Sequence, residues 1–458
     1  MAQKPDYQSI PELRSQVSLL SFKVEGEKPR GPIEKFLSIF ADVRAGEGAG
    51  ALILMVNVLL LLGAYYLLRI AREPLILTEG GATVKAYSSA GQAALLMLLV
   101  PLYGLVAARV NRLKLVAGLT LFFASHLLVF QFLGFAGARI GVAFFIWAGI
   151  FNVFVISQFW AFANDIYTES QGKRLFPMIG VGASLGALLG ALVASFLFKQ
   201  YKFTPYALMS TAAGVLVICA ALTWAANRVE TSRTDQVMSK HANDPIPGAN
   251  GFQLVFQSRY LRLVALLIVL LNVVNTTGEF LLGSLVAQEA TRLFPGDAAA
   301  MRSYIGGFYA DFNIWVNLTG LLIQTFAVSR IFNLISVRGA LFVMPSLALT
   351  SYSVFAIAPA LAVVRGVKIL ENATDYSLQN TIRHALYLPT SRPEKYKAKA
   401  AIDTFFMRFG DVLQGVVVKV GTELSVGFSG FAWFNVAMTM VWLWIASRLG
   451  HEHRRMGF

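Results

Sequence analysis

Every third apolar segment of this chain lacks charge. Twelve apolar segments follow one another, and between flanking basic residues the third, sixth, ninth and twelfth carry no ionisable side chain other than His126. They lie at about 113–133, 204–226, 339–357 and 428–448, each close to the roughly 20 residues that an α-helix needs to cross a bilayer. An ionisable side chain at mid-bilayer costs about 2.5–3.5 kcal/mol on insertion scales, so helices without one can face lipid.

The first, fourth, seventh and tenth segments instead carry ionisable residues. These are Arg69, Arg72, Glu73, Asp165, Glu279, Arg365, Lys368, Glu371, Asp375 and Arg383. Helices with such side chains are expected to face a cavity or one another. A period of three that repeats four times therefore predicts two six-helix halves around a central polar path, which indicates a transporter.

The composition is that of a membrane protein. Of the 458 residues, 56% are hydrophobic and 14% charged, and the apolar runs are too long for the stripes of a soluble fold. We predict an all-α integral membrane protein with twelve transmembrane helices in two pseudo-symmetric six-helix bundles. The expected parts are a cytoplasmic N-terminal segment at 1–50, a bundle at 51–227, a cytoplasmic linker at 228–259, a second bundle at 260–449 and a cytoplasmic tail at 450–458.

The net charge of +14 follows the predicted topology. Basic residues cluster after the even-numbered segments two to ten, whereas the opposite loops hold few: Lys85, Arg139, Lys199, Lys202, Arg292 and Arg302. The positive-inside rule then places both termini in the cytoplasm. We expect a monomer in the lipid bilayer of a bacterial inner membrane, and no nucleic-acid partner.

The tenth segment carries the densest polar stripe. At about 100° per residue, its polar residues fall within about 120° of one another, on one face of a helix. These residues are Arg365, Lys368, Glu371, Asn372, Asp375, Gln379 and Arg383. The stripe predicts either a water-filled binding path or an ion-pair ladder that locks the two halves together.

The seventh and eighth segments repeat this design. The seventh aligns Asn272, Asn275, Thr276 and Glu279, and the eighth aligns Tyr309, Asn313, Asn317 and Gln324, with Asp311 off that face. Glu279 is a candidate proton carrier, substrate ligand or partner of a basic residue. The amides of the eighth segment suit either a ligand or helix–helix hydrogen bonds.

The first and eleventh segments add cations. Tyr65, Arg69, Arg72 and Glu73 share a face near the predicted outer end of the first helix (about 51–71), and Arg408 and Asp411 lie three residues apart in the eleventh. Fixed positive charge at low dielectric attracts phosphate or carboxylate strongly, which favours an anionic substrate. Arg408 and Asp411 are also placed to pair with each other.

Motifs for catalysis and metal binding are not found. The histidines show no HExxH spacing, and there is no GxSxG. The glycine-rich segment with Gly182, Gly186 and Gly190 has no following GK[ST], so its spacing of four indicates close helix packing rather than phosphate binding. We therefore predict no enzyme activity, no metal and no cofactor.

Three longer segments resemble a known family. They are REPLILTEGG (Arg72–Gly81), FWAFANDIYTESQGKRLFPMIGVGAS (Phe159–Ser184) and DYSLQNTIRHALYLPTSRPEKYKAKAAIDTFF (Asp375–Phe406). They are similar to the ATP:ADP antiporters, the nucleotide transporter family of plastids and obligate intracellular bacteria, and more closely to its free-living bacterial relatives. The loop GLVAARVNRLK (Gly104–Lys114) also resembles the motif between helices two and three of the major facilitator superfamily. The resemblance implies the major facilitator fold and nucleotide antiport.

The resemblance also implies roles for single positions. The cationic position late in helix one is matched by Arg72, and the helix-seven glutamate by Glu279. The family's helix-four glutamate corresponds to Ala148, and its helix-eleven lysine to Asp411, after Gly410. The lost acid and the inverted charge leave the substrate open between a nucleotide and another phosphorylated or anionic metabolite.

We predict a secondary active transporter that moves this anion by alternating access, with its two halves rocking around a midplane site. The expected substrate-binding residues are Arg69, Arg72, Glu73, Asn164, Glu279, Tyr309, Asn313, Asn317, Lys368, Glu371, Asn372, Asp375, Arg408 and Asp411. One alternative is a proton-coupled carrier of a lipid, amino acid or other zwitterion. A second is a non-transporting scaffold or receptor, which predicts closed ion pairs and no cavity for a solute.

Overall fold

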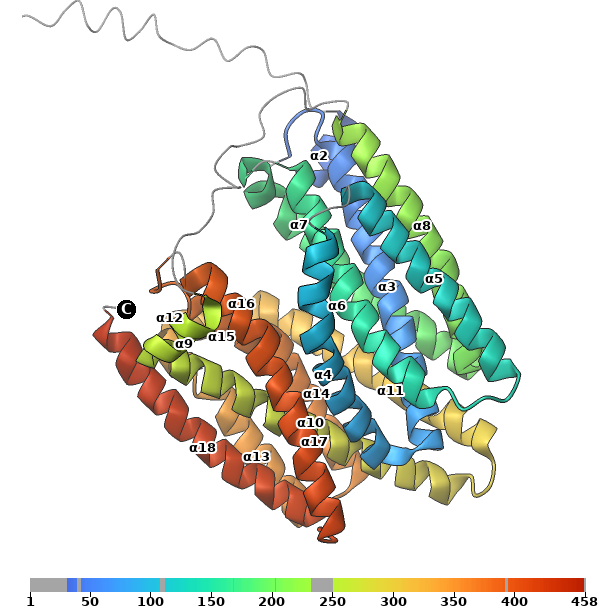
Figure 1. Ribbon diagram of the computed structural model, residues 1–458, viewed down its shortest axis with the longest axis vertical. Helices are drawn as coiled ribbons and strands as arrows, with labels where there is room; N and C mark the ends of the chain where they lie inside the picture. Colours follow the sequence, from blue (N-terminus) through green and yellow to red (C-terminus); the bar gives the residue numbers. More distant parts are fainter. Residues whose placement is uncertain are drawn as a thin grey trace, which may run out of the picture.

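The computed structural model describes residues 31–38, 43–107, 112–167, 169–201, 203–231, 250–391 and 394–456. Within these ranges the regular elements are helices, and Figure 1 shows them in two groups. The N-terminal bundle follows the short α2 (Pro32–Leu37) and consists of α3 (Gly48–Glu79), α4 (Gly81–Ala107), α5 (Arg112–Phe135), α6 (Gly141–Ile166), α7 (Glu169–Gln200) and α8 (Pro205–Thr231).

The C-terminal bundle contains shorter and interrupted helices. After α9 (Gly251–Gln257) it consists of α10 (Arg259–Leu293), α11 (Ala298–Leu322), α12 (Val328–Ala340), α13 (Val343–Ile357), α14 (Leu361–Thr374), α15 (Asn380–Ala385), α16 (Lys399–Ala401), α17 (Met407–Glu423) and α18 (Phe428–Arg455). Four π-helical turns join some of these: η1 (Ile323–Ala327), η2 (Asp375–Gln379), η3 (Glu394–Ala398) and η4 (Ile402–Phe406). A backbone kink at Ser336, with φ of 56°, separates the eighth and ninth predicted segments.

In the described ranges, eight helices are long and apolar enough to cross a membrane. They are α3, α5, α6, α7, α8, α10, α18 and the run from α11 to α12. The other predicted spans coincide with α4, α13, the α14–α15 run and the η3–α17 run. The all-helical membrane fold is confirmed, whereas the number twelve stays a prediction. The predicted bundle and linker boundaries also stay predictions, and residues 1–30 and 232–249 lie outside the described part.

The first helix is longer than predicted. We expected it to end near residue 71, but α3 continues through Pro74 to Glu79. A proline interrupts one backbone hydrogen bond, and membrane helices tolerate this where neighbouring helices enclose the site. Leu75 and Ile76, which follow Pro74, are fully buried. The Glu79 carboxylate accepts a hydrogen bond of 2.7 Å from the backbone N–H of Gly141, where α6 begins, which ties the two helix ends together.

Three glycines bring α7 against α3, as their spacing predicts. A side chain at Gly182 would meet the carbonyl oxygen of Met55 at 2.5 Å, and one at Gly186 would meet that of Leu59. At Gly190 it would lie 2.6 Å from the carbonyl oxygen of Gly63. The contacted residues on α3 are also four apart, so the two backbones run in contact over two turns.

Two of the uncharged helices, α5 and α18, are among the less buried spans. In the most apolar 18-residue window, 56% of α3 and 67% of α10 is buried, against 28% of α5 and 39% of α18. Phe122, Leu128 and Phe132 of α5 are more than half exposed, which suits contact with lipid tails. For α5 and α18 this agrees with the charge pattern, whereas the uncharged α8 is as buried as α7, at 44%.

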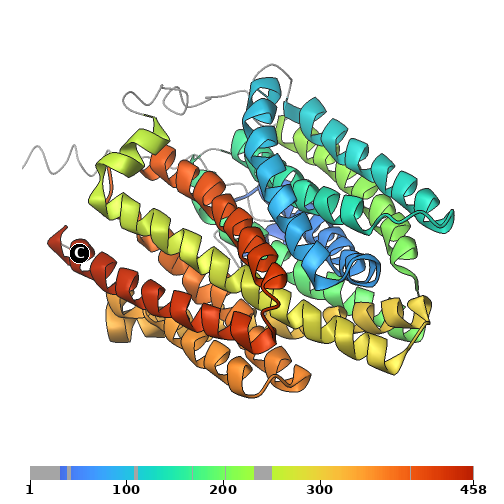
Figure 2. The ribbon, with the colours of Figure 1, turned by 60° about the horizontal axis from the view of Figure 1, so that its bottom comes forward.

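The two bundles touch at one end and diverge toward the other (Figures 1 and 2). Contacts between them include Phe198 of α7 against Gly306 of α11, and Ala90 of α4 against Gly415 of α17. These residues lie toward the end of the molecule where α3 connects to α4, α7 to α8 and α10 to α11, which we call the closed end. The opposite end, with α2 and α9, is called the open end.

Candidate functional site

A cavity of about 160 Å³ lies between the bundles, and we call it the central cavity. The N-terminal bundle lines it with Arg69, Arg72, Glu73, Ala82, Lys85, Ala86, Ser89 and Phe145. The C-terminal bundle lines it with Asn275, Thr276, Glu279, Phe280, Tyr309, Phe312, Asn313, Asn372, Tyr376 and Gln414. Seven of the residues predicted to bind substrate are therefore at this cavity: Arg69, Arg72, Glu73, Glu279, Tyr309, Asn313 and Asn372.

One wall of the cavity is a buried ion cluster around Glu73. Its carboxylate lies 2.6 Å from Lys85 Nζ and 3.2 Å from Arg72 Nε. The Arg72 guanidinium also stacks 4.5 Å above the ring of Phe145. We expected Lys85 in a loop, but it lies within α4 and is buried, because Glu73 on the neighbouring helix supplies the opposite charge.

Arg69 has a different environment. Its guanidinium donates hydrogen bonds to the hydroxyls of Tyr66, at 3.3 Å, and Tyr376, at 2.7 Å. It also lies 5.3 Å and 5.7 Å from the two ring centroids, within cation–π range. The Tyr66 hydroxyl in turn donates to Asn317 of the other bundle, at 3.0 Å. Within the described part of the chain, the direct partners of the Arg69 guanidinium are thus neutral phenols.

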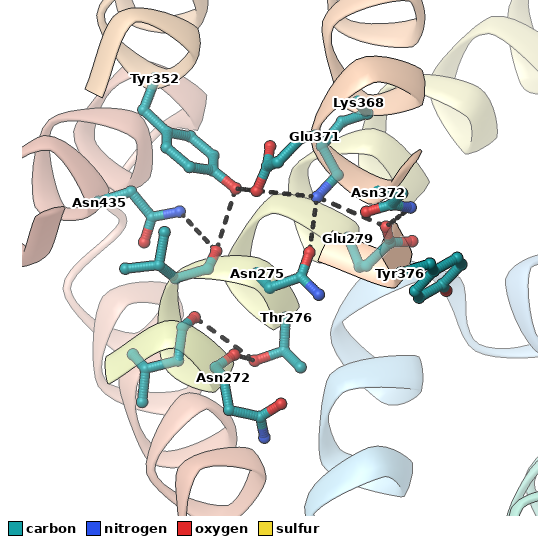
Figure 3. A network of polar contacts seen from close by, with 12 residues as sticks. Asn272, Asn275, Thr276, Glu279, Tyr352, Lys368, Glu371, Asn372, Tyr376 and Asn435 are labelled. Atoms are coloured by element: carbon teal, nitrogen blue, oxygen red, sulfur yellow. Dashed lines mark hydrogen bonds and ion pairs between the residues drawn. The ribbon is translucent and has the colours of Figure 1, made fainter. Parts of the chain in front are cut away.

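The opposite wall borders a polar network inside the C-terminal bundle (Figure 3). The fully buried Lys368 Nζ lies 3.3 Å from Glu371 and 3.5 Å from Glu279, and donates to Asn275 at 3.0 Å. The amide of Asn372 donates to Glu279 at 2.9 Å. These five residues come from α10 and α14, so this ladder does not join the two bundles.

Two peripheral helices complete the network. Tyr352 of α13 donates a hydrogen bond of 2.8 Å to the Glu371 carboxylate. Asn435 of α18 donates to the backbone carbonyl of Val274, at 3.0 Å. Lys368 and Glu371 therefore point into the C-terminal bundle and are absent from the lining of the central cavity.

The remaining predicted binding residues lie elsewhere. The Arg408 guanidinium lies 3.3 Å from the Asp411 carboxylate, so the predicted pairing of these two residues is confirmed. The Asp411 carboxylate also accepts a hydrogen bond of 2.6 Å from the Asn272 amide. Asn164 is exposed on α6 and donates to its own helix. Asp375 begins η2, outside the cavity lining.

Sequence reasoning missed several residues of the site. Tyr66, Tyr376 and Gln414 were not predicted, nor were Tyr352 and Asn435. Asn435 was detectable, because an amide in an otherwise apolar span usually has a polar partner. Tyr376 was not, since tyrosine is common in membrane helices and this one lies beside the polar stripe rather than on it.

The central cavity has a small positive excess. Arg69, Arg72 and Lys85 line it against Glu73 and Glu279, which gives three cations minus two anions, or +1. Glu73 is paired with Arg72 and Lys85, and Glu279 with Lys368. Among these three cations, Arg69 has no carboxylate in direct contact, and it lies between the two bundles.

A sequence model of the TLC ATP/ADP transporter family matches residues 142–453, from the start of α6 into the last turn of α18. The chain belongs to the TLC ATP/ADP transporter family. The family resemblance deduced from the sequence motifs is thereby confirmed. The chain is a multi-pass membrane protein of a transporter family.

Curated relatives of this TLC-family chain are ADP,ATP carrier proteins. ADP,ATP carrier protein 1 of Chlamydia muridarum is 25% identical over 353 residues, covering 67% of this chain and 64% of the relative. That of Chlamydia trachomatis is 25% identical, covering 65% and 62%. ADP,ATP carrier protein 1 of Rickettsia conorii is 23% identical, covering 68% of each. The chain thus spans less than two thirds of the length of the two chlamydial carriers.

Solved structures of membrane transporters share the fold of this family member. A bacterial homologue of the iron transporter ferroportin in an inward-facing state has a TM-score of 0.63 at 14% identity, covering 88% of this chain and 98% of that one. The nucleoside transporter NupG has a TM-score of 0.61 at 12% identity, covering 89% and 98%. At these identities the likeness shows the fold alone, which confirms the predicted major facilitator architecture.

Proposed function

We propose that this TLC-family chain is a nucleotide transporter that exchanges ATP and ADP across a bacterial inner membrane by alternating access. The observation that carries the proposal is Arg69, whose direct partners are neutral tyrosines and which faces a cavity between two bundles. A guanidinium in such a setting is suited to bind phosphate oxygens in a bidentate manner.

The cavity chemistry supports a nucleotide. Arg69 and Arg72 would contact the phosphates, and Lys85 would join them when Glu73 exchanges partners. Phe145 and Tyr309 would offer ring faces to the base once Arg72 and Lys85, which lie over those rings, turn to the phosphates. The amides of Asn275 and Asn372 would hydrogen-bond its edge.

The departures from the family pattern fit this assignment of roles. Ala148 is fully buried and cannot bind an ion, and Asp411 is engaged by Arg408 and Asn272. Neither residue lines the central cavity. Nucleotide binding in this chain would therefore depend on the cations of α3 and α4.

The volume of the central cavity indicates which movement substrate binding requires. At about 160 Å³ the central cavity is smaller than the roughly 300–1,000 Å³ typical of ligand pockets. Binding thus requires the walls to move apart, which would break the Arg69–Tyr376 and Tyr66–Asn317 contacts between the bundles. With both termini in the cytoplasm, as the charge pattern predicts, the open end faces inward.

A second candidate is a zwitterion carrier. The Glu73–Lys85 pair presents an acid and a base side by side at the cavity, and both charges of an amino acid would find a partner there. In either case we propose transport without covalent chemistry, by a monomer surrounded by lipid.

The test is uptake into proteoliposomes. We expect labelled ATP to enter vesicles preloaded with ADP and not empty ones, and Arg69→Ala to reduce uptake at least about tenfold, the loss of a charge-assisted hydrogen bond. Arg69→Lys should retain part of the activity. Arg330→Ala, at an exposed arginine of α12, is the matched control. Uptake of amino acids without nucleotide exchange would replace the nucleotide proposal with the zwitterion carrier.

A further inference from the structure

A second and larger cavity lies at the closed end, apart from the central cavity. Its volume is about 740 Å³, within the range of about 300–1,000 Å³ that ligand sites occupy. It is lined by Phe198, Lys199, Phe203, Thr204, Pro205, Tyr206, Phe294, Ala299, Ala300, Arg302, Ser303, Tyr304, Gly307, Phe308, Asp311 and Arg365. We call it the seam cavity, because α7 and α8 of one bundle and α11 and α14 of the other line it, together with Phe294 after α10.

The seam cavity combines aromatic walls with positive charge. Six of its lining residues are phenylalanine or tyrosine, and none of the six lines the central cavity. They are Phe198, Phe203, Tyr206, Phe294, Tyr304 and Phe308. Its cations are Lys199, Arg302 and Arg365, and its acid is Asp311, so three minus one gives +2. This excess is larger than the +1 of the central cavity, which favours an anion attached to an apolar body.

Two of the cations have unused donors or weak partners. The Nε of Arg302 is buried and, in the described part of the chain, has no hydrogen-bond acceptor. Buried polar groups of this kind are nearly always bonded to protein, water or ligand. Arg365 lies 5.1 Å above the ring of Phe308 and 4.0 Å from Asp311, at the limit of an ion pair. Both guanidinium groups are therefore available to an anion.

Asp311 competes for the same cations. Its two carboxylate oxygens lie 2.7 Å from Lys199 Nζ, and Ser195 donates to it at 2.9 Å. These contacts join α7 to α11 across the seam. A phosphate in the cavity would repel the Asp311 carboxylate and share its cations, so occupancy and the Lys199–Asp311 contact oppose each other.

We propose that the seam cavity binds a phosphate group carried on an aromatic or aliphatic body, with Arg302 and Arg365 on the phosphate and the aromatic side chains against the body. Two sources share this chemistry, a nucleotide in solution and an anionic phospholipid of the surrounding leaflet. The inference does not depend on nucleotide transport through the central cavity, because Arg69 and its neighbours take no part in it.

Photo-crosslinking distinguishes the sources and the sites. The full chain in nanodiscs would be illuminated with 8-azido-ATP in one arm and with photoactivatable phosphatidylglycerol in the other, and crosslinked peptides identified by mass spectrometry. We expect label on residues 294–311 in at least one arm. Arg302→Gln should weaken binding of that probe about tenfold, as for one charge-assisted hydrogen bond. Asp311→Asn should strengthen binding of the probe. A misfolded variant would lose binding, so a gain cannot result from misfolding.

Matched variants make the outcome unambiguous. Arg292→Gln, at an exposed arginine near the closed end that pairs with Glu289 outside the cavity, should leave labelling unchanged. Arg69→Ala should remove nucleotide label from the central cavity and leave label at 294–311 intact. The proposal is overturned if neither probe labels 294–311, or if Arg302→Gln and Asp311→Asn leave that label at its wild-type level. Failure of nucleotide exchange in vesicles, by contrast, would leave it standing.

Discussion

The guanidinium of Arg69 on α3 lies 2.7 Å from the hydroxyl of Tyr376 on η2, so a cation proposed to bind substrate also holds the two bundles together. The Tyr66–Asn317 hydrogen bond runs beside this contact. A phosphate bound to Arg69 would offer a stronger, charged acceptor than a phenol. Substrate binding and release of this contact between the bundles are in this way linked through one side chain.

Tyr376→Phe tests the contact separately from binding. The change keeps the ring near Arg69 and removes the hydrogen-bond acceptor. Since Tyr376 is 42% exposed, we expect a loss of roughly 1 kcal/mol, about fivefold in the equilibrium between joined and separated bundles. With Cys219 replaced by alanine, Ser89→Cys in the cavity lining would react with a hydrophilic thiol reagent faster in the Tyr376→Phe background. Tyr201→Phe, at an exposed tyrosine, should leave the rate unchanged. Equal rates in the two backgrounds would contradict the link.

The main expected effect of Lys368→Ala is a loss of protein stability. The substitution leaves Glu371 buried beside Tyr352 without its cation, a change that typically costs about 3–5 kcal/mol. Adding Glu371→Gln should recover part of the loss, because the buried negative charge is then gone. The measurement is a double-mutant cycle of thermal unfolding midpoints in detergent. Additive effects of the two changes would mean that the ion pair contributes nothing.

Gly186→Ala should separate α7 from α3. The new methyl group would meet the carbonyl oxygen of Leu59 and lie 2.8 Å from its carbonyl carbon, so backbone must shift at a cost of about 1–3 kcal/mol. Gly180→Ala on the same helix meets no atom within 4 Å and is the matched control, expected to be neutral or mildly stabilising. Thermal unfolding of both variants checks this, and a smaller midpoint shift for Gly186→Ala than for Gly180→Ala would contradict the packing argument.

Glu47, which precedes α3, makes stability depend on acid. Burial raises the pKa of its carboxyl, but hydrogen bonds from the Arg174 side chain, the Arg44 backbone and the Gln171 side chain outweigh burial, and the pKa is lowered from its usual value of 4.5. A carboxyl with a lowered pKa contributes stability above its unfolded pKa, and that contribution disappears as the pH falls through the folded pKa.

At pH 7, Glu47→Gln should therefore lower the free energy of unfolding by roughly 2–3 kcal/mol and lower the unfolding midpoint with it. Below about pH 4.5 the difference between variant and wild type should become progressively smaller. Arg174 contacts both carboxylate oxygens, at 2.8 and 2.9 Å, which is why the charge matters at this site. Unfolding midpoints of both proteins between pH 3.5 and 7 provide the measurement. A constant difference across this range would show that the Glu47 charge does not contribute.

Much of the architecture was predictable from the sequence. The cost of charge in lipid decides which segments are peripheral, so the uncharged α5 and α18 were placed correctly without any knowledge of contacts. The glycines of α7 likewise reveal a close helix contact, because only a missing Cβ lets two backbones approach. The predicted end of α3 was wrong. The helix continues through Pro74 because neighbouring helices, which lie far away in the sequence, enclose that site.

The sequence by itself determined that α14 has one polar face, and it identified Lys368, Glu371 and Asn372 as members of it. Only the tertiary structure decided where that face points. Tyr352, from the apolar α13, holds the Glu371 carboxylate inside the C-terminal bundle, while Asn372 reaches the central cavity. The rotation of a helix about its axis is set by side chains on other helices, and periodicity along one segment holds no information about them.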